Sequence, residues 1–325
     1  MSAIGVIGAG AWGTALAQTL ASAGREVRLW AREPALAEAI NATRENAAYL
    51  PGVALSPAIR ATSDLGSIAE AAPNLVVTPA QHMRGVLSAV PRNAQPLVLC
   101  CKGLEAGTHR LMSEVAAELH PASAVAVLSG PTFAREVAEG LPTAATVAHE
   151  QPAAARELAE LFAGTSLRPY VSTDVVGAEI GGAVKNVLAI ACGVVDGAGL
   201  GRNARAALIA RGFAEMTRFG LARGARAETL AGLSGMGDLV LTCSSTQSRN
   251  FSLGVGIGQG ARAADLLANR RTVAEGAATA PVLREAAAAA NVDMPVTAAV
   301  CELLAGADAR AVIGALLARP IREEG

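Results

Sequence analysis

One charged side chain and one amide interrupt an apolar stretch of small residues between Gly181 and Ile190. Lys185 and Asn186 stand side by side there, inside a predicted helix. A buried charge is costly unless it is paired, binds a ligand or faces a cavity. Lys185 is therefore a candidate catalytic amine. The alternative is a lysine at the rim of the helix whose long side chain reaches solvent.

A carboxylate and a run of donors form a second candidate group. Asp238 lies beside Gly237, and the run Ser-Arg-Asn at 248–250 follows it ten to twelve residues later. On loops, these residues offer one carboxylate and three hydrogen-bond donors. The guanidinium fork of arginine matches phosphate oxygens, and serine and asparagine can fill the remaining positions. The alternative is a turn followed by a polar helix cap.

Two further polar turns follow predicted strands. Lys102 stands at the end of the strand 97–101, and the turn Ser-Gly-Pro-Thr at 129–132 follows the strand 124–128. Ligands of open α/β sheets bind beyond the carboxyl ends of the strands, so these turns would bring an ammonium group, backbone N–H groups and hydroxyls to one place. The alternative for Lys102 is a solvated surface lysine.

The turn Gly8-Ala9-Gly10-Ala11-Trp12-Gly13 joins the first predicted strand to a helix that we expect to begin directly after Gly13. In the dinucleotide-binding pattern, Gly8 permits the tight turn, Gly10 lets the backbone approach a pyrophosphate, and Gly13 lets the helix pack on the strand. The free N–H groups and the dipole of the helix then favour an anion. The alternative is a glycine turn in an ordinary βα unit.

The end of the second predicted strand, 26–30, indicates which nucleotide is preferred. NAD-specific sites usually carry an acidic residue there, but this strand is followed by Ala31 and Arg32, with Glu33 only afterwards. A guanidinium group suits the additional phosphate of NADP, and one charge-assisted hydrogen bond contributes roughly 1.5–3 kcal/mol. We therefore predict that NADP is preferred and NAD tolerated. The alternative is that Arg32 is a solvated surface residue.

The elements that must position these groups fall into two halves. Over roughly the first 170 residues, strands alternate with helices, which predicts a doubly wound, mostly parallel sheet of the Rossmann type. We expect its strands at 4–7, 26–30, 59–62, 74–77, 97–101 and 124–128, with late edge strands at 143–148 and 168–172. From residue 175 onward the sequence predicts only helices, at 177–194, 203–219, 226–230, 252–258, 261–269, 277–290 and 295–305. The fold class is thus α/β, with a nucleotide-binding domain at 1–174, an all-α substrate domain at 175–325 and a cleft between them.

Composition limits the classes of partner. With 27 basic and 28 acidic residues the net charge is −1, so no global field attracts nucleic acid or an anionic membrane. The five cysteines are scattered without metal-ligand spacing, and we expect reduced, mostly buried thiols. The start lacks the basic region of a signal peptide, and the longest apolar run, 187–195, is far shorter than a membrane span. These features predict a cytoplasmic protein without membrane insertion or a metal site.

Six motifs together resemble one known family. They are Gly8 to Ala17 (GAGAWGTALA), Lys102 to Glu105 (KGLE), Ser129 to Ala134 (SGPTFA), Val184 to Asn186 (VKN), Gly237 to Leu239 (GDL) and Ser248 to Asn250 (SRN). In this order and spacing the sequence resembles the bacterial NAD(P)-dependent glycerol-3-phosphate dehydrogenases over nearly its whole length. The one mild departure is Ala11, where many relatives have serine; backbone N–H groups can still bind the pyrophosphate there.

The resemblance assigns roles to individual residues. It implies that Lys185 is the proton donor and acceptor, supported by Asp238, Asn186 and Thr242. The implied substrate contacts are Lys102, Gly130, Thr132, Lys185, Asp238, Ser248, Arg249 and Asn250. The implied cofactor contacts are Gly8, Gly10, Ala11, Trp12, Gly13, Arg32, Tyr49, Lys102, Ala134, Arg249, Val273 and Glu275.

The function that the resemblance implies is the interconversion of dihydroxyacetone phosphate and sn-glycerol 3-phosphate by hydride transfer with NAD(P)H. It would supply glycerol phosphate for phospholipid synthesis from a cytoplasmic homodimer. One competing interpretation is a dehydrogenase of a sugar acid, a hydroxy acid or a coenzyme A ester, which would not need the run at 248–250. Another is a cofactor-sensing module without turnover. A cation in the cleft fits the reduction of dihydroxyacetone phosphate, because negative charge builds on the carbonyl oxygen during this reaction.

Overall fold

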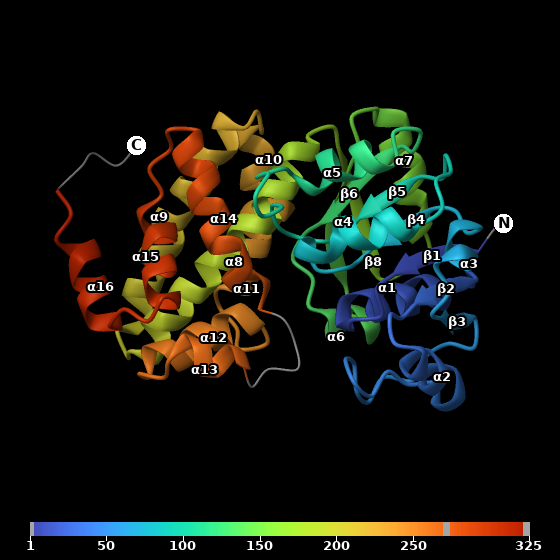
Figure 1. Ribbon diagram of the computed structural model, residues 1–325, viewed down its shortest axis with the longest axis horizontal. Coiled ribbons are helices and arrows are strands. Elements are labelled where there is room, and N and C mark those ends of the chain that lie inside the picture. Colours follow the sequence, from blue (N-terminus) through green and yellow to red (C-terminus); the bar gives the residue numbers. More distant parts are fainter. Residues whose placement is uncertain (1–2, 269–273, 321–325) are drawn as a thin grey trace.

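The computed structural model describes residues 3–268 and 274–320, and Figure 1 shows a sheet-containing half joined to a helical half. Eight strands form one sheet in the order β3-β2-β1-β4-β5-β6-β7-β8. Their bounds are β1 Ile4–Ile7, β2 Val27–Trp30, β3 Ile59–Thr62, β4 Asn74–Val76, β5 Leu97–Leu99, β6 Val125–Ser129, β7 Thr143–Ala148 and β8 Leu167–Ser172. The first six strands are parallel, which confirms the predicted fold class.

The late strands correct one prediction. β7 runs antiparallel to β6 and lies between β6 and β8, so of these two late strands only β8 is at an edge of the sheet. Each predicted range is close to the observed one, but the sequence of a strand does not tell which neighbours it pairs with. The helix that follows β7 returns the chain to the far side of that strand, and this crossover makes β7 an interior strand.

The helices of this half cover the sheet. They are α1 Ala11–Ser22, α2 Pro34–Thr43, α3 Leu65–Ala69, α4 Ala80–Ala89, α5 Met112–Leu119, α6 Ala134–Ala138, α7 Pro152–Ala159 and the short 3-10 helix η1 Glu160–Phe162. α1 begins at Ala11 rather than after Gly13, so Gly13 lies within its first turn. The five-residue helix α6 was not predicted, because one turn is too short to show a periodic apolar pattern.

The second half contains only helices among its described residues. They are α8 Val175–Gly197, α9 Gly201–Ala222, α10 Ala227–Ala231, the π-helical turn η2 Leu233–Gly237, α11 Asp238–Thr242, α12 Arg249–Gly258, α13 Ala263–Ala268, α14 Glu275–Ala289, α15 Pro295–Leu304 and α16 Ala309–Leu317. Figure 1 shows α8 in the middle of this half, with α9, α14 and α15 beside it and α16 at the far end. η2, α11 and α16 were not predicted.

Helix α8 is the core of the helical half, and every residue from 177 to 195 is buried. The helix has 23 residues and is apolar enough to cross a membrane by length and composition. The apolar segment is therefore longer than the run 187–195 that the sequence suggested. The reason is that the helix continues through the small residues that precede this run. However, 89% of its most apolar window is buried inside the fold, as in the core helix of a globular protein. All five cysteines are buried and free, as predicted.

Candidate active site

The glycine turn lies where the strand order reverses between β1 and β4. Gly8 has a φ of +122°, and a Cβ at this position would lie 2.9 Å from the carbonyl oxygen of Val77. A Cβ at Gly13 would lie 1.9 Å from the carbonyl oxygen of Gly8, so both positions require glycine. At Gly10 nothing lies within 4 Å of an added Cβ. The turn therefore leaves open space at the start of α1, where the phosphate groups of a ligand can approach the backbone.

The start of α1 offers donors without partners. No side chain caps the helix at Gly10, and the indole Nε1 of Trp12 is buried without a hydrogen-bond partner. Buried Asn46 holds the wall of this region, because its Nδ2 donates to the carbonyl oxygen of Ala9 at 2.9 Å and its Oδ1 accepts from the backbone N–H of Tyr49 at 3.2 Å. Asn46 was not predicted, since no motif includes it. The orphaned donor and the open turn fit a dinucleotide.

Two amines and one carboxylate form the centre of the site. Lys185 on α8 donates from Nζ to Oγ1 of Thr242 at 2.8 Å and lies 3.1 Å from Oδ1 of Asp238. Nζ of Lys102, from the segment after β5, lies 2.5 Å from the other carboxylate oxygen of Asp238 and donates to the carbonyl oxygen of Gly130 at 3.3 Å. These are the only two lysines in the printed sequence, and all its other Lys/Arg residues are arginines. The guanidinium group of arginine stays protonated near neutral pH, whereas a buried lysine amine can exchange a proton there.

The environment adjusts the charges of this group. Burial lowers the pKa of Lys185 to about 8, with a further lowering from the like charge of Lys102 and an opposing effect of Asp238. Burial alone would raise the pKa of Asp238, but the two neighbouring ammonium groups outweigh it and hold this pKa below its usual value. Burial also raises the pKa of Glu275 at the start of α14. Lys185 can therefore exchange a proton near neutral pH while Asp238 stays ionised.

The run at 248–250 forms the start of a helix. The Oγ of Ser248 accepts from the backbone N–H of Phe251 at 3.2 Å, so Ser248 caps α12 as the structural alternative predicted. Arg249 and Asn250 occupy the first turn of α12, and Asp238 is the first residue of α11. The expectation that these groups lie on loops was wrong, because the two helices are only ten and five residues long and begin at polar residues. Their helical placement fixes the side chains more rigidly than loops would.

Two amides join the walls of the site. Nδ2 of Asn250 donates to Oδ1 of Asn186 at 2.9 Å, and Oδ1 of Asn250 accepts from the backbone N–H of Gly276 at 2.9 Å. Nδ2 of Asn186 in turn donates to the carbonyl oxygen of Gly182 at 3.4 Å. The first turn of α12 is thus tied to α8 beside Lys185 and to the start of α14.

A cleft of about 460 Å³ between the two halves brings most predicted site residues together. Its lining includes Ala11, Trp12, Tyr49, Lys102, Thr132, Ala134, Lys185, Asn186, Asp238, Thr242, Ser248, Arg249, Asn250 and Glu275. Gly8, Gly10, Gly13, Gly130 and Arg32 are not among the residues that line the cleft, and Val273 lies outside the described residues. The side chain of Arg32 is 76% exposed, and its Nη2 lies 2.5 Å from Oε1 of Glu33.

Five further residues line the cleft without having been predicted: Leu50, Cys100, Phe133, Arg135 and Gln247. Each one is a chain neighbour of a predicted residue or lies two positions away from one, which is the only signal that the sequence offered. Arg135 adds a cation, and its Nη2 donates to the carbonyl oxygen of Pro51 at 2.7 Å.

Sheets of this order bind dinucleotides at the crevice where the strand order reverses. Here a lysine of lowered pKa lies in the adjoining cleft, which suits a protein that moves a proton together with a hydride. Fold and cleft therefore define the class of nicotinamide-nucleotide-dependent dehydrogenases with a helical second half.

Comparison with known proteins identifies the family. Residues 3–155 match the N-terminus, and residues 174–313 the C-terminus, of NAD-dependent glycerol-3-phosphate dehydrogenase. The chain is 62% identical to a glycerol-3-phosphate dehydrogenase [NAD(P)+] of Erythrobacter litoralis and 55% identical to that of Caulobacter vibrioides, covering 99% of this chain and at least 97% of each relative. Its fold matches the crystal structure of glycerol-3-phosphate dehydrogenase from Coxiella burnetii with a TM-score of 0.94 and 37% identity, covering 98% of this chain and 99% of that one. The chain belongs to the NAD-dependent glycerol-3-phosphate dehydrogenase family.

Proposed function

We propose that this protein interconverts dihydroxyacetone phosphate and sn-glycerol 3-phosphate by hydride transfer with NAD(P)H, and so supplies glycerol phosphate for phospholipid synthesis. The observation that carries the proposal is the meeting of Lys185, Asp238 and Lys102 in the cleft that Arg249 and Asn250 also line. An amine that exchanges protons and a guanidinium that reads phosphate are the two groups that this reaction needs. A sugar-acid or coenzyme A ester dehydrogenase would not need the second group at this place.

The residues at the glycine turn would hold the dinucleotide. Gly10 leaves room for the pyrophosphate, the uncapped start of α1 and the orphaned Nε1 of Trp12 offer donors, and Tyr49 and Ala134 line the neighbouring wall. When bound, the nicotinamide supplies or accepts the hydride. Ala11 lacks the hydroxyl that a serine would offer here. This difference weakens nucleotide binding without abolishing it, because the backbone N–H groups of the helix remain.

Lys185 supplies the proton in the direction of reduction. As the hydride reaches C2 of dihydroxyacetone phosphate, negative charge builds on the carbonyl oxygen, and the ammonium group of Lys185 stabilises it and then donates a proton. Asp238 and Thr242 hold Nζ in place through contacts of 3.1 Å and 2.8 Å. In the opposite direction the neutral amine accepts the proton of the C2 hydroxyl of glycerol 3-phosphate.

The phosphate end of the substrate fits the first turn of α12. Arg249 and Asn250 lie there at the positive end of the dipole of a ten-residue helix, and the guanidinium group and the dipole both favour an anion. Binding energy from this non-reacting end then positions the carbonyl group at Lys185. Thr132 and Lys102 complete the set of donors around the substrate.

Further parts of the proposal concern the nucleotide and the state of the protein. We propose that NADP is preferred over NAD, with the guanidinium of Arg32 exchanging its contact with Glu33 for the additional phosphate. We also propose the domain division 1–174 and 175–325, a cytoplasmic location, and a homodimer. Light scattering combined with size exclusion measures the oligomeric state directly.

Initial rates with dihydroxyacetone phosphate and each reduced cofactor test the activity. Lys185→Met, a change that nearly conserves volume, should remove most of kcat while NADPH still binds. Arg249→Ala should reduce kcat/KM for dihydroxyacetone phosphate far more than for unphosphorylated dihydroxyacetone. If the wild-type protein binds NADPH but does not turn over dihydroxyacetone phosphate, the protein is a cofactor-sensing module. If Lys185→Met keeps wild-type turnover, Lys185 is not the proton donor.

A further inference from the structure

The segment that carries Lys102 belongs to both halves of the molecule. Residues 100–111, which we call the Lys102 loop, connect β5 to α5 in the sheet-containing half. Leu104 and Leu111 of this loop form an isolated bridge with each other and are buried in the apolar core of the helical half. Its Lys102 reaches Asp238 on α11. The position of the Lys102 ammonium group therefore depends on how this loop is anchored between the halves.

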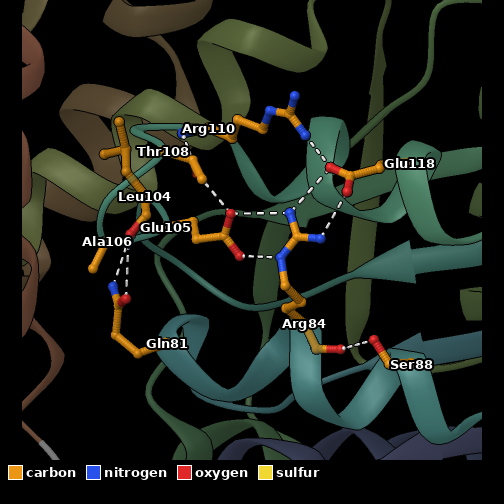
Figure 2. A network of polar contacts seen from close by, with 9 residues as sticks. All are labelled: Gln81, Arg84, Ser88, Leu104, Glu105, Ala106, Thr108, Arg110 and Glu118. Carbon is orange, nitrogen blue, oxygen red and sulfur yellow. Dashed lines mark hydrogen bonds and ion pairs between the residues drawn. The ribbon is translucent and has the colours of Figure 1, made fainter.

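Two side chains of α4 anchor the loop from the sheet side, as Figure 2 shows. Nε2 of Gln81 donates to the carbonyl oxygen of Leu104 at 2.7 Å, and Oε1 of Gln81 accepts from the backbone N–H of Ala106 at 3.0 Å. Nε and Nη2 of Arg84 donate to the two carboxylate oxygens of Glu105 at 2.7 and 3.1 Å. Glu105 thus forms a bidentate ion pair with Arg84, and Gln81 binds the backbone of its two neighbours, Leu104 and Ala106.

The contact between Arg84 and Glu105 is part of a closed network. The second edge of the same guanidinium binds both carboxylate oxygens of Glu118 on α5, at 2.9 and 3.1 Å, and Thr108 donates to Glu105 at 2.6 Å. The side chain of Glu105 is only 12% exposed, and the hydrogen bonds from Arg84 hold its pKa below the usual value. Partial burial and bidentate geometry make such a pair stronger than an exposed one.

Glu105 belongs to the motif Lys102 to Glu105, yet it lies outside the cleft and the mechanism above gives it no task. Only two residues separate it from Lys102, so an anchored Glu105 restricts where the Lys102 backbone can lie. We propose that Arg84, acting through Glu105, is a positioning residue that holds the ammonium group of Lys102 against Asp238. The inference rests on the proposed function, because Lys102 is taken there as a substrate contact.

Loss of the anchor has a defined chemical consequence. If the loop shifts, Lys102 moves away from Asp238 and Lys185, and Lys185 loses the like charge that lowers its pKa. The other charged or titratable groups acting on Lys185 are Asp238, Cys243 and Glu275, and none of these lies on the Lys102 loop. The pH above which dihydroxyacetone phosphate reduction declines should then rise, while a general loss of folded protein would lower activity without moving this pH.

The test compares Arg84→Met, Lys102→Met and the double variant in reduction of dihydroxyacetone phosphate. We expect Arg84→Met to lower kcat/KM about ten-fold and to move the decline in activity to higher pH, since a displacement of about 1 Å can cost up to a hundred-fold. Because Arg84 acts through Lys102, the double variant should match Lys102→Met within about two-fold. Multiplicative losses in the double variant would overturn the proposal.

Arg110→Gln is the matched control. Arg110 contacts Glu118 in the same network but does not touch the carboxylate of Glu105, so kcat/KM should stay within about two-fold of wild type. If Arg84→Met fails to fold, Glu105→Gln replaces it, because the amide keeps the size of the side chain and loses the bidentate pair. Equal effects of the Arg110 and Arg84 changes would contradict a specific role.

A readout without turnover separates this inference from the proposed function. Lysine labelled selectively with carbon-13 gives signals from only two side chains, which Lys102→Met assigns. In Arg84→Met the Lys102 signal should move towards that of a solvated lysine, and in Arg110→Gln it should not. An unmoved Lys102 signal overturns the positioning role whether or not the wild-type protein reduces dihydroxyacetone phosphate.

Discussion

Replacing Asp238 by asparagine tests how the site controls the proton on Lys185. Oδ1 of Asp238 lies 3.1 Å from Nζ of Lys185. At an effective dielectric constant of about 20, two unit charges at this separation attract each other by about 5 kcal/mol, which would correspond to about 4 pKa units. Water and side-chain relaxation in the cleft reduce this effect, so we expect Asp238→Asn to lower the pKa of Lys185 by at least about one unit from its value near 8.

The sign of the effect follows from the role of the amine. In the proposed mechanism, reduction of dihydroxyacetone phosphate needs protonated Lys185, so its kcat/KM should fall as pH rises through the pKa of Lys185. Oxidation of glycerol 3-phosphate needs the neutral amine, so its kcat/KM rises over the same range. In Asp238→Asn both transitions should move to lower pH by about one unit or more. Profiles of kcat/KM against pH in the two directions measure this shift.

Thr242→Val is the control for this experiment. It removes the 2.8 Å hydrogen bond from Lys185 to Oγ1 of Thr242 and leaves the charge of Asp238 in place. We expect a lower kcat with transitions close to those of wild type. The reasoning is refuted if Asp238→Asn leaves the two transitions where they are or moves them to higher pH, since removing a carboxylate can only disfavour the ammonium form of its neighbour.

Three other changes test separate parts of the structure. Arg32→Ala should reduce the ratio of NADPH to NADH affinity by about ten-fold or more, measured by fluorescence titration, and an unchanged ratio would contradict the role of Arg32. Gly13→Ala should destabilise the fold and weaken nucleotide binding, because its Cβ would lie 1.9 Å from the carbonyl oxygen of Gly8; native stability by thermal unfolding would contradict the tight packing. Burial raises the pKa of Glu179, which accepts hydrogen bonds from Ser113, to about 7 from 4.5, so wild type loses stability as pH rises through about 7. Glu179→Gln should therefore gain about 2.5 kcal/mol relative to wild type between pH 5 and pH 8 in urea unfolding, whereas a pH-independent difference would contradict the burial of this carboxyl group.

Local sequence patterns predicted the parts of the fold that depend on near neighbours. The glycine turn, the run of strands and the apolar surroundings of Lys185 are all visible within a few residues, because hydrophobic periodicity and glycine positions act locally. The prediction failed for helices of a single turn and for the position of a strand that depends on its pairing partners. α6 and α11 have only five residues each, and β7 becomes an interior strand through the crossover that follows it.

The candidate site shows the same division. Lys185 and Asp238 could be singled out because charged groups in apolar or glycine-rich segments are unusual, and Arg249 because it stands in a run of hydrogen-bond donors that suits phosphate. Asn46 could not be found in this way, since its importance comes from contacts with Ala9 and Tyr49 that only the folded chain creates. Arg84 and Glu105 are 21 positions apart and on different elements, so their bidentate contact has no signature in spacing.

The charge of the cleft explains how a protein with net charge −1 can gather an anionic substrate. Among the described residues that line the cleft, Lys102, Arg135, Lys185 and Arg249 are basic, whereas only Asp238 and Glu275 are acidic. Burial raises the pKa of Glu275, while the neighbouring cations Arg249, Lys185 and Lys102 oppose this shift. A phosphate monoester near neutral pH carries a charge between about −1.5 and −2, which this excess can balance. The attraction is therefore local, and added salt should weaken substrate binding only moderately because the charges sit in a recess.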